Sequence, residues 1–290
     1  MPRHAECCTL YMTDLEPVHL VARALPHTLL FHDWCEALSL WRRLVATVPK
    51  ARAVCVMPNH VHLVTTDPLA RAKLSKLMSG FARWRSHKRG SQSATCWQPQ
   101  PEIRPVADIK HLRRTIRYVL LNPCRGGLAS DPLRWPLSNH RDLTGLAIDF
   151  AADGEPERLH RYVSSDPSVS LAGTELPAKH RGHAPLAVVE AAVGSVLRLA
   201  PTELTATAFS TRVLVRAATV CESAGVARLA QHTGWSRSWV YQQLNPPEMP
   251  DIRGDRALTC VMRVIGDPRF GSLTLAPRAT PTRWGGWTQG

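Results

Sequence analysis

The sequence lacks several features that would assign it to common classes. It has eight cysteines but no Cys-x-x-Cys pair, which argues against a zinc ribbon or a disulfide framework. No apolar run approaches the ~20 residues that a helix needs to cross a bilayer. Residues 1–11 also lack the apolar segment of a signal peptide. We therefore expect a soluble, cytoplasmic protein with reduced thiols and no membrane partner.

Acidic residues are scarce relative to basic ones. Thirty-six Lys and Arg stand against 23 Asp and Glu, a formal net charge of +13. Most of the excess lies in residues 1–150, which contain 21 basic and 11 acidic side chains. Such a field favours a polyanion such as DNA, because neutralising phosphates releases counterions. Charge alone is also compatible with ribosome or membrane-surface binding.

Local patterns divide the 290 residues, 44% of them hydrophobic, into two modest domains. Residues 1–150 mix strand and helix patterns, 151–184 are polar and fit a linker, 185–275 have helical periodicity, and 276–290 form a loose tail. The predicted elements are a strand at 18–22, a helix at 33–48 capped by Asp33, a hairpin at 53–66, a helix at 68–89, a loop at 90–106, a helix at 108–121 stopped by Asn122-Pro123, and a loop at 125–150.

Two histidines share one face of the second strand of the predicted hairpin. Side chains alternate along a strand, so His60 and His62 point to one side and Val61 and Leu63 to the other. The apolar pair should pack inward while the imidazoles face away from the core, where they can share a cation. His-x-His is a short pattern, and two unrelated histidines are the competing interpretation.

The helix predicted at 108–121 places Tyr118 outside its apolar stripe. A phenol with Arg114 and Asn122 one turn away on either side can attack a phosphodiester and form a phosphotyrosine. Asn122 precedes Pro123, so it could instead only cap the helix end. The helical projection groups Ile109, Leu112, Ile116, Val119 and Leu120 on one side, and His111, Arg114, Thr115, Tyr118 and Asn122 on the other.

A metal ion would assist this chemistry by polarising the scissile phosphate and stabilising the departing oxygen. Two imidazoles and one amide oxygen, from His60, His62 and Asn122, leave positions open for phosphate and water. This ligand set suits Mg²⁺ or Mn²⁺ better than a closed zinc site.

Two segments resemble the signature segments of a known family. Residues 55–64 (CVMPNHVHLV) and 117–128 (RYVLLNPCRGGL) are similar, in order and spacing, to those of the REP-associated tyrosine transposases. This family belongs to the single-tyrosine branch of the HUH (His-hydrophobe-His) endonucleases. The resemblance covers roughly residues 15–145.

The resemblance implies an α+β fold, an antiparallel sheet flanked by helices, followed here by a smaller all-α domain. It implies that His60 and His62 bind the metal with Asn122, and that Tyr118 is the nucleophile. The implied activity is a metal-dependent endonuclease and strand transferase on single-stranded DNA at hairpins, in a nucleoid-associated monomer or homodimer. Residues 96–105 and 134–143 depart from the family pattern, which leaves substrate preference open.

Residues 226–244 contain a helix-turn-helix pattern. Ala230, Gly234 and Val240 have the spacing of a small crossing residue, a turn glycine and an apolar anchor. The wider segment from Pro185 resembles the C-terminal helical domain of bacterial replication initiators, and an ordinary helical hairpin is the alternative. The second helix would present four side chains to a groove of duplex DNA: Arg237, Ser238, Tyr241 and Gln242.

The helix predicted at 68–89 is strongly basic. Its cations would contact phosphates and orient the strand, or else form a solvated face. Trp84 and Trp97 would either stack on unpaired bases or belong to the core. The cations are Lys73, Lys76, Arg83, Arg85, Lys88 and Arg89.

Two other functions are open on the sequence alone. A zinc hydrolase would add His111 or His140 to the histidine pair and would not depend on Tyr118. A former transposase could bind hairpin DNA without cutting it. The presence of His60, His62 and Tyr118 together ranks the active enzyme first.

Overall fold

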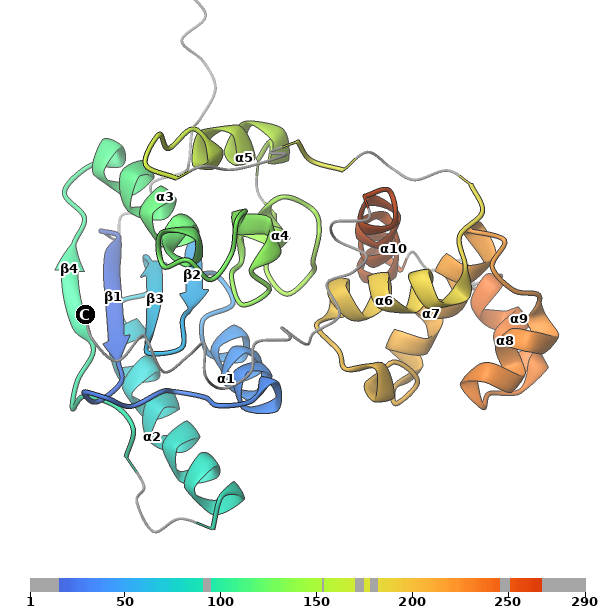
Figure 1. Ribbon diagram of the computed structural model, residues 1–290, viewed down its shortest axis with the longest axis horizontal. Helices are drawn as coiled ribbons and strands as arrows, with labels where there is room; N and C mark the ends of the chain where they lie inside the picture. Colours follow the sequence, from blue (N-terminus) through green and yellow to red (C-terminus); the bar gives the residue numbers. More distant parts are fainter. Residues whose placement is uncertain are drawn as a thin grey trace, which may run out of the picture.

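The computed structural model describes residues 16–90, 95–152, 154–169, 175–177, 182–245 and 251–267. An α+β part built on a four-stranded sheet comes first and a helical part follows, as the sequence predicts (Figure 1). The tail predicted at 276–290 lies outside the described ranges. Within these ranges no helix is both long and apolar enough to cross a bilayer.

The sheet has the strand order β2–β3–β1–β4, and every pairing is antiparallel. The predicted strand is β1 (Val18–Arg23), and the predicted hairpin is β2 (Ala53–Val56) with β3 (His60–Thr65). The loop prediction for 90–106 is wrong, because β4 (Glu102–Pro105) pairs there with β1. All four β4 residues are exposed. An edge strand that has no buried side and ends in proline lacks the apolar alternation by which strands are found.

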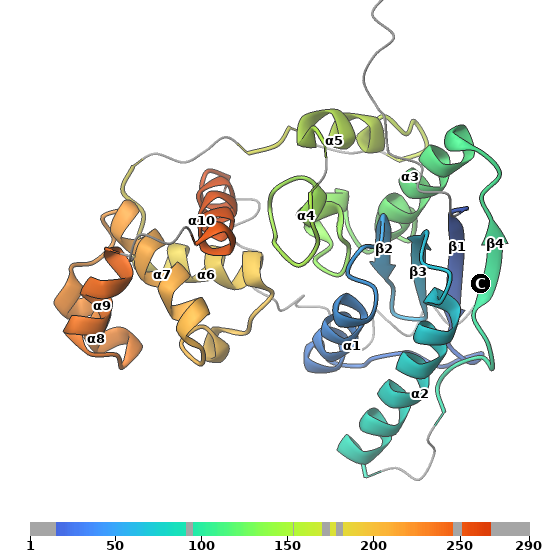
Figure 2. The same ribbon diagram turned by 180° about the vertical axis from the view of Figure 1, so that it is seen from behind.

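Helices cover both faces of this sheet (Figures 1 and 2). On one face α3 (Ile109–Arg125) packs against β2 and β3. The opposite face is apolar and buried, with Leu20 and Leu63 at its centre, and α1 (Trp34–Thr47) and α2 (Ala70–Lys88) pack together there. Asp33 caps α1 as predicted and accepts a hydrogen bond of 2.8 Å from the backbone N–H of Glu36.

Helix α3 continues beyond its predicted end. It runs through Pro123 to Arg125, because a proline near the end of a helix removes only one backbone hydrogen bond. The N–H groups of Gly126 and Leu128 bond back to the carbonyls of Asn122 and Pro123, at 2.9 and 2.8 Å. Asn122 is therefore an interior helix residue rather than a cap.

The helical part has its own apolar core. The predicted helix pair is confirmed in α8 (Val226–Thr233) and α9 (Arg237–Leu244), with Gly234 at φ 74° between them and Ala230 and Val240 buried. A positive φ of this size favours glycine over other residues. The other helices of this part are α6 (Leu186–Leu197), α7 (Ala208–Val220) and α10 (Ile252–Ile265), with a short 3-10 turn, η2 (Pro201–Glu203).

Three short helices lie between the two parts. The region predicted as a loop at 125–150 contains η1 (Pro132–Arg134) and α4 (His140–Leu143). The predicted linker at 151–184 contains α5 (Pro156–Ser164), which packs against α3.

The stretch after α3 joins the sheet to the helical part. The backbone N–H of Val56 donates to Leu137 (2.8 Å), and that of Asn139 donates to Val54 (3.1 Å). The side-chain oxygen of Asn139 accepts a bond of 2.8 Å from the N–H of Val54. The outer edge of β2 is therefore covered. Three residues from this stretch, Leu133, Leu146 and Ile148, belong to the core of the helical part.

Candidate active site

Strand β3 brings the predicted histidine pair together beneath α3. The ring centroids of His60 and His62 lie 4.6 Å apart, on the sheet face that also contains Arg23 and Val21 of β1. The prediction that the imidazoles face away from the core is wrong, because α3 covers them and leaves His62 only 1% exposed.

Asn122 of α3 lies between the two imidazoles. Its Oδ1 is 3.2 Å from Nε2 of His60, and its Nδ2 is 3.2 Å from Nε2 of His62. The extension of α3 beyond its predicted end places this side chain over the sheet. The three residues predicted to bind metal therefore converge on one point.

The outer nitrogens of the two rings are already occupied. Nδ1 of His60 donates to Oδ1 of Asn59 (2.7 Å), and Nδ1 of His62 lies 2.9 Å from Nε2 of His19. A proton on each Nδ1 leaves a lone pair on each Nε2. Nε2 of His60 and Oδ1 of Asn122 are then two acceptors facing each other without a proton between them. Neighbouring ligands of an octahedral Mg²⁺ or Mn²⁺ ion lie about 3 Å apart, so the donor set fits a divalent cation.

The three histidines of the cluster are neutral near neutral pH. Burial, with a smaller effect of Arg23, lowers the pKa of His60 to about 4. Burial and then Arg104 lower the pKa of His19 to about 4. Burial, followed by the neighbouring His60 and His19, lowers the pKa of His62 well below its ordinary value. A neutral imidazole is the form that binds metals.

His19 belongs to the site although no sequence pattern predicts it. Strand alternation places it on the same face as Val21 and Arg23. It reaches His62 only because β1 pairs with β3 in the observed register. Strand register between distant segments depends on the folded sheet, and one sequence offers no pattern that specifies it.

Tyr118 lies at the open side of the cluster. Its ring centroid is 5.5 Å from that of His62, and the guanidinium carbon of Arg125 lies 5.4 Å from it. The side chain is 38% exposed, so a substrate can reach it. The predicted apolar and polar sides of α3 are right only in part. Ile109 of the apolar side is exposed, whereas Thr115 of the polar side is buried.

A pocket of about 390 Å³ opens beside Tyr118. Arg104 of β4 and Arg114 of α3 contribute its positive charge. Arg104 also donates to Glu102 at 2.8 and 3.1 Å, and its pKa is raised by that pairing and, to a smaller extent, by Tyr118. The pocket can therefore accept a phosphate next to the phenol. Its lining residues are His19, Arg104, Pro105, Val106, His111, Arg114, Thr115 and Tyr118.

Half of the cations predicted for DNA contact on α2 are bonded to α1. Arg89 forms an ion pair of 2.5 Å with buried Glu36, and Lys88 forms one of 3.2 Å with Asp33. Arg85 is buried 3.9 Å from Glu36, so its predicted phosphate contact is wrong.

The other three predicted cations are exposed on α2 and are not bonded to α1, and Lys73 among them pairs with Asp67 at 2.5 Å. Lys76 and Arg83 are exposed without an ion pair to any described residue. Trp97 is in the core, the second of its two predicted roles, whereas Trp84 lies half-buried.

The four side chains predicted to meet duplex DNA are all exposed on α9. They are Arg237, Ser238, Tyr241 and Gln242.

The zinc hydrolase interpretation lacks a third ligand in the part of the chain that the structure describes, where no three His, Cys, Asp or Glu side chains are grouped to hold a metal. His140 is fully buried against His160, with 3.1 Å between their nitrogens. His111 lies in the pocket beside Tyr118, where its Nδ1 accepts a bond from Ala107.

No protein-family model matches the chain. The chain is 31% identical over 105 residues to the REP-associated tyrosine transposase of Escherichia coli (strain K12). That match covers 34% of this chain and 60% of the relative, which is less than two thirds of the relative's length. A solved structure of the REP-associated tyrosine transposase bound to a REP hairpin is 19% identical, with a TM-score of 0.36 over 52% of this chain and 93% of that one. The sequence match confirms that this chain is related to the REP-associated tyrosine transposases.

Proposed function

We propose that the protein is a metal-dependent endonuclease and strand transferase that acts on single-stranded DNA beside a hairpin, through a covalent bond to Tyr118. The observation that supports this most directly is the convergence of an exposed phenol with two neutral imidazoles, an amide and a cationic pocket. The name of the related protein points to the same class of reaction.

Tyr118 is the nucleophile in this proposal. Its oxygen attacks the phosphorus, the bond from phosphorus to the departing sugar oxygen breaks, and that oxygen takes up a proton. The phenol proton is released to solvent as the new bond forms. The phosphotyrosine keeps the energy of the broken bond, so a free hydroxyl can later displace Tyr118 and reseal a strand. Arg104 and Arg114 orient the phosphate and offset its charge.

His60, His62 and Asn122 would hold Mg²⁺ or Mn²⁺. When bound, the ion polarises the scissile phosphate and offsets charge on the departing oxygen. His19 and Asn59 keep both rings in the tautomer that presents Nε2. The depressed pKa values keep those nitrogens unprotonated at neutral pH.

The remaining DNA contacts follow the charge distribution. Lys76 and Arg83 on α2 would contact phosphates of the strand, since neither is bonded to a described acid. Helix α9 would enter a groove of duplex DNA with its exposed face.

Adduct formation tests the proposal. We expect labelled hairpin DNA with single-stranded flanks to form a covalent adduct in Mg²⁺ or Mn²⁺, visible on a denaturing gel. Tyr118→Phe should abolish the adduct, because it lacks the attacking oxygen. Tyr162→Phe is the matched control, since its ring faces Arg117 of α3 outside the site.

The other outcomes separate the alternatives. Cleavage that persists in Tyr118→Phe would contradict a phosphotyrosine and favour metal-assisted hydrolysis. Binding of hairpin DNA with no cleavage by the wild type would favour a former transposase that now only binds.

A further inference from the structure

An arginine at the end of α6 enters the α+β part of the molecule. Arg198 is 1% exposed and has a left-handed backbone with φ 50°. Its Nε donates to the carbonyl of Pro136 (2.7 Å), and Nη2 donates to the carbonyl of Ser138 (3.1 Å) and to Asp142 (2.7 Å). Its Nη1 donates to Asp142 (3.2 Å) and Asp149 (2.6 Å). These five bonds match the five donors of a guanidinium group.

Trp41 of α1 completes this contact. Its ring lies 4.5 Å from the guanidinium carbon of Arg198, and its Nε1 donates to Asp149 at 2.7 Å. A buried ion pair repays its desolvation only in good geometry. The directional bonds of Arg198 therefore specify where the end of α6 lies against the α+β part.

Backbone hydrogen bonds connect the residues around Arg198 to the candidate active site. Ser138, which accepts from Arg198, lies between Leu137 and Asn139, and these two residues are bonded to β2. Strand β2 pairs directly with β3, where Cys55 lies opposite His62. A continuous chain of hydrogen bonds and strand pairing thus runs from the histidine pair to the end of α6.

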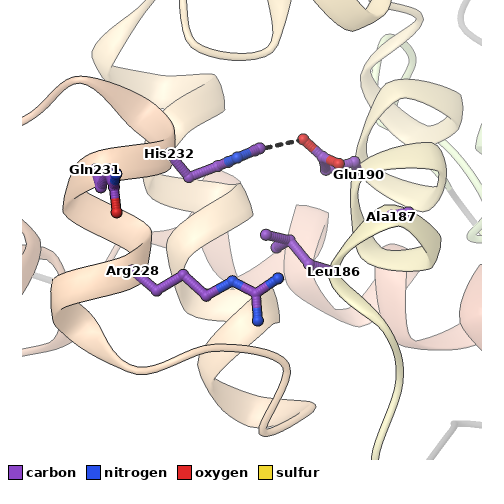
Figure 3. Close-up of a pocket in the computed structure, with 6 residues that line it drawn as sticks. All are labelled: Leu186, Ala187, Glu190, Arg228, Gln231 and His232. Carbon is purple, nitrogen blue, oxygen red and sulfur yellow. Dashed lines mark hydrogen bonds and ion pairs between the residues drawn. The ribbon is translucent and has the colours of Figure 1, made fainter.

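Side-chain contacts also join α6 and α7 to the helix-turn-helix. Glu190 of α6 and His232 of α8 point toward each other across a pocket, with 2.6 Å between their polar atoms (Figure 3). Arg212 of α7 donates to Gln243 of α9 at 2.7 Å, and Val240 of α9 is buried in the helical core. The exposed face of α9 is therefore held in a fixed position.

We infer that α9 binds a DNA duplex continuous with the single strand that Tyr118 attacks, and that Arg198 sets the spacing between the two contacts. Arg237, Tyr241 and Gln242 offer this duplex a cation, a phenol and an amide, which are groups that contact phosphates and base edges. The inference rests on the proposed strand cleavage and predicts cleavage at a set spacing from the bound duplex.

The test varies that spacing with the full chain and Mn²⁺. Hairpin DNA with a labelled single strand is joined to a flanking duplex through thymidine spacers of increasing length, and a reference substrate lacks the duplex. We expect the duplex to raise the rate of adduct formation about tenfold at one spacer length and little at the others. The rate of adduct formation with the duplex, divided by the rate on the reference substrate, isolates the effect of the duplex contact.

Variants assign the effect to its residues. Arg237→Ala and Gln242→Ala should reduce the ratio to about 1 and weaken binding of an isolated duplex, measured by fluorescence anisotropy. Lys50→Ala removes an exposed cation from the loop after α1 and should leave both unchanged. Arg198→Met should retain duplex binding while the preference for one spacer disappears. If that variant fails to fold by circular dichroism, Asp149→Asn loosens the same contact at its more exposed partner.

Each outcome decides a separate point. A wild-type ratio of 1 at every spacer length would overturn the inference and leave strand cleavage intact. The absence of a Tyr118-dependent adduct on all substrates would overturn the proposed function instead. Duplex affinity that does not respond to Arg237→Ala or Gln242→Ala would exclude α9 as the contact in either case.

Discussion

His19 determines which nitrogen of His62 faces the site. Nδ2 of Asn122 donates to Nε2 of His62, so the neutral ring carries its proton on Nδ1 and donates it to His19 at 2.9 Å. Residues that orient a metal ligand in this way typically contribute tenfold or more to metal affinity. We expect His19→Phe to weaken Mn²⁺ binding about 10- to 100-fold, measured by isothermal titration calorimetry or by the electron paramagnetic resonance of free Mn²⁺. His19→Gln retains an acceptor and should lose less. Equal affinities of the two variants would mean that His19 only packs.

His140 should make the fold sensitive to acid. Burial, and then the facing His160, lowers the pKa of His140 well below its ordinary value of 6.5. The unfolded chain therefore takes up a proton first as pH falls through 6.5, and the stability contributed by the neutral ring is lost below that pH. The loss is about 1.4 kcal/mol per pH unit for one proton.

Urea unfolding at several pH values between about 7 and about 5 checks this prediction. The pKa values of His19, His60 and His62 are lowered as well, so these residues add to the same pH dependence. The contribution of His140 is therefore measured as the difference between the wild type and His140→Gln. In that variant the unfolding free energy should fall less steeply with decreasing pH, by a slope that corresponds to about one proton fewer taken up on unfolding. Identical slopes would mean that His140 is protonated equally in both states.

At the scale of the elements, Glu36 holds α2 against α1. Its buried carboxylate pairs with Arg85 and Arg89 and accepts from the N–H of His32 at 2.9 Å. Glu36→Ala leaves a buried cation without its partner, which typically costs about 3–5 kcal/mol. Asp67→Ala is the control, since it breaks the more exposed pair with Lys73 and should cost about 1 kcal/mol or less. Chemical denaturation measures both, and equal losses would contradict a structural role for Glu36.

Elements whose pattern is local could be predicted from the sequence. Asp33 starts α1 because a capping carboxylate needs only the three residues after it. The turn at 57–59 between two apolar runs specifies the β2–β3 hairpin, and strand alternation then places His60 and His62 on one face. Gly234 between two short amphipathic helices likewise predicts α8 and α9.

Features that depend on distant partners could not be predicted. Strand β4 has no buried side, so only its pairing with β1 identifies it. The continuation of α3 through Pro123 depends on packing that one sequence does not specify. Arg198 and Asp142 are 56 residues apart, and no local spacing rule connects them. His60, His62, Tyr118 and Asn122 were therefore predicted as site residues, whereas His19 and Arg104 were not.

At the scale of the whole molecule, the contact of Arg198 should contribute to global stability. Arg198→Met leaves Asp142 buried without its cation, and we expect a loss of about 3–5 kcal/mol in unfolding free energy. Lys88→Met is the matched control, since it breaks an ion pair with Asp33 (3.2 Å) in which both side chains are more than a third exposed. That change should cost about 1 kcal/mol or less. Comparable losses in urea unfolding would place Arg198 among ordinary surface pairs.

The same contact affects how the molecule should be divided experimentally. A chain cut before residue 185 would lose Arg198 and expose the groups that bond to it, including the carboxylate of Asp142. If such a fragment failed to bind or cleave DNA, misfolding would explain the loss as well as the missing helical part would. Point variants on α9 avoid this ambiguity.

The two edges of the sheet are protected in different ways. Backbone bonds from residues 137–139 cover β2, whereas β4, in the part of the chain that the structure describes, pairs only with β1 and exposes Glu102, Arg104 and Pro105. Charges and proline at an open strand edge discourage other molecules from adding a strand and aggregating. Arg104 also lines the pocket beside Tyr118. Replacing Arg104 with an apolar residue to alter DNA binding would therefore also remove a charge that discourages self-association at this strand edge.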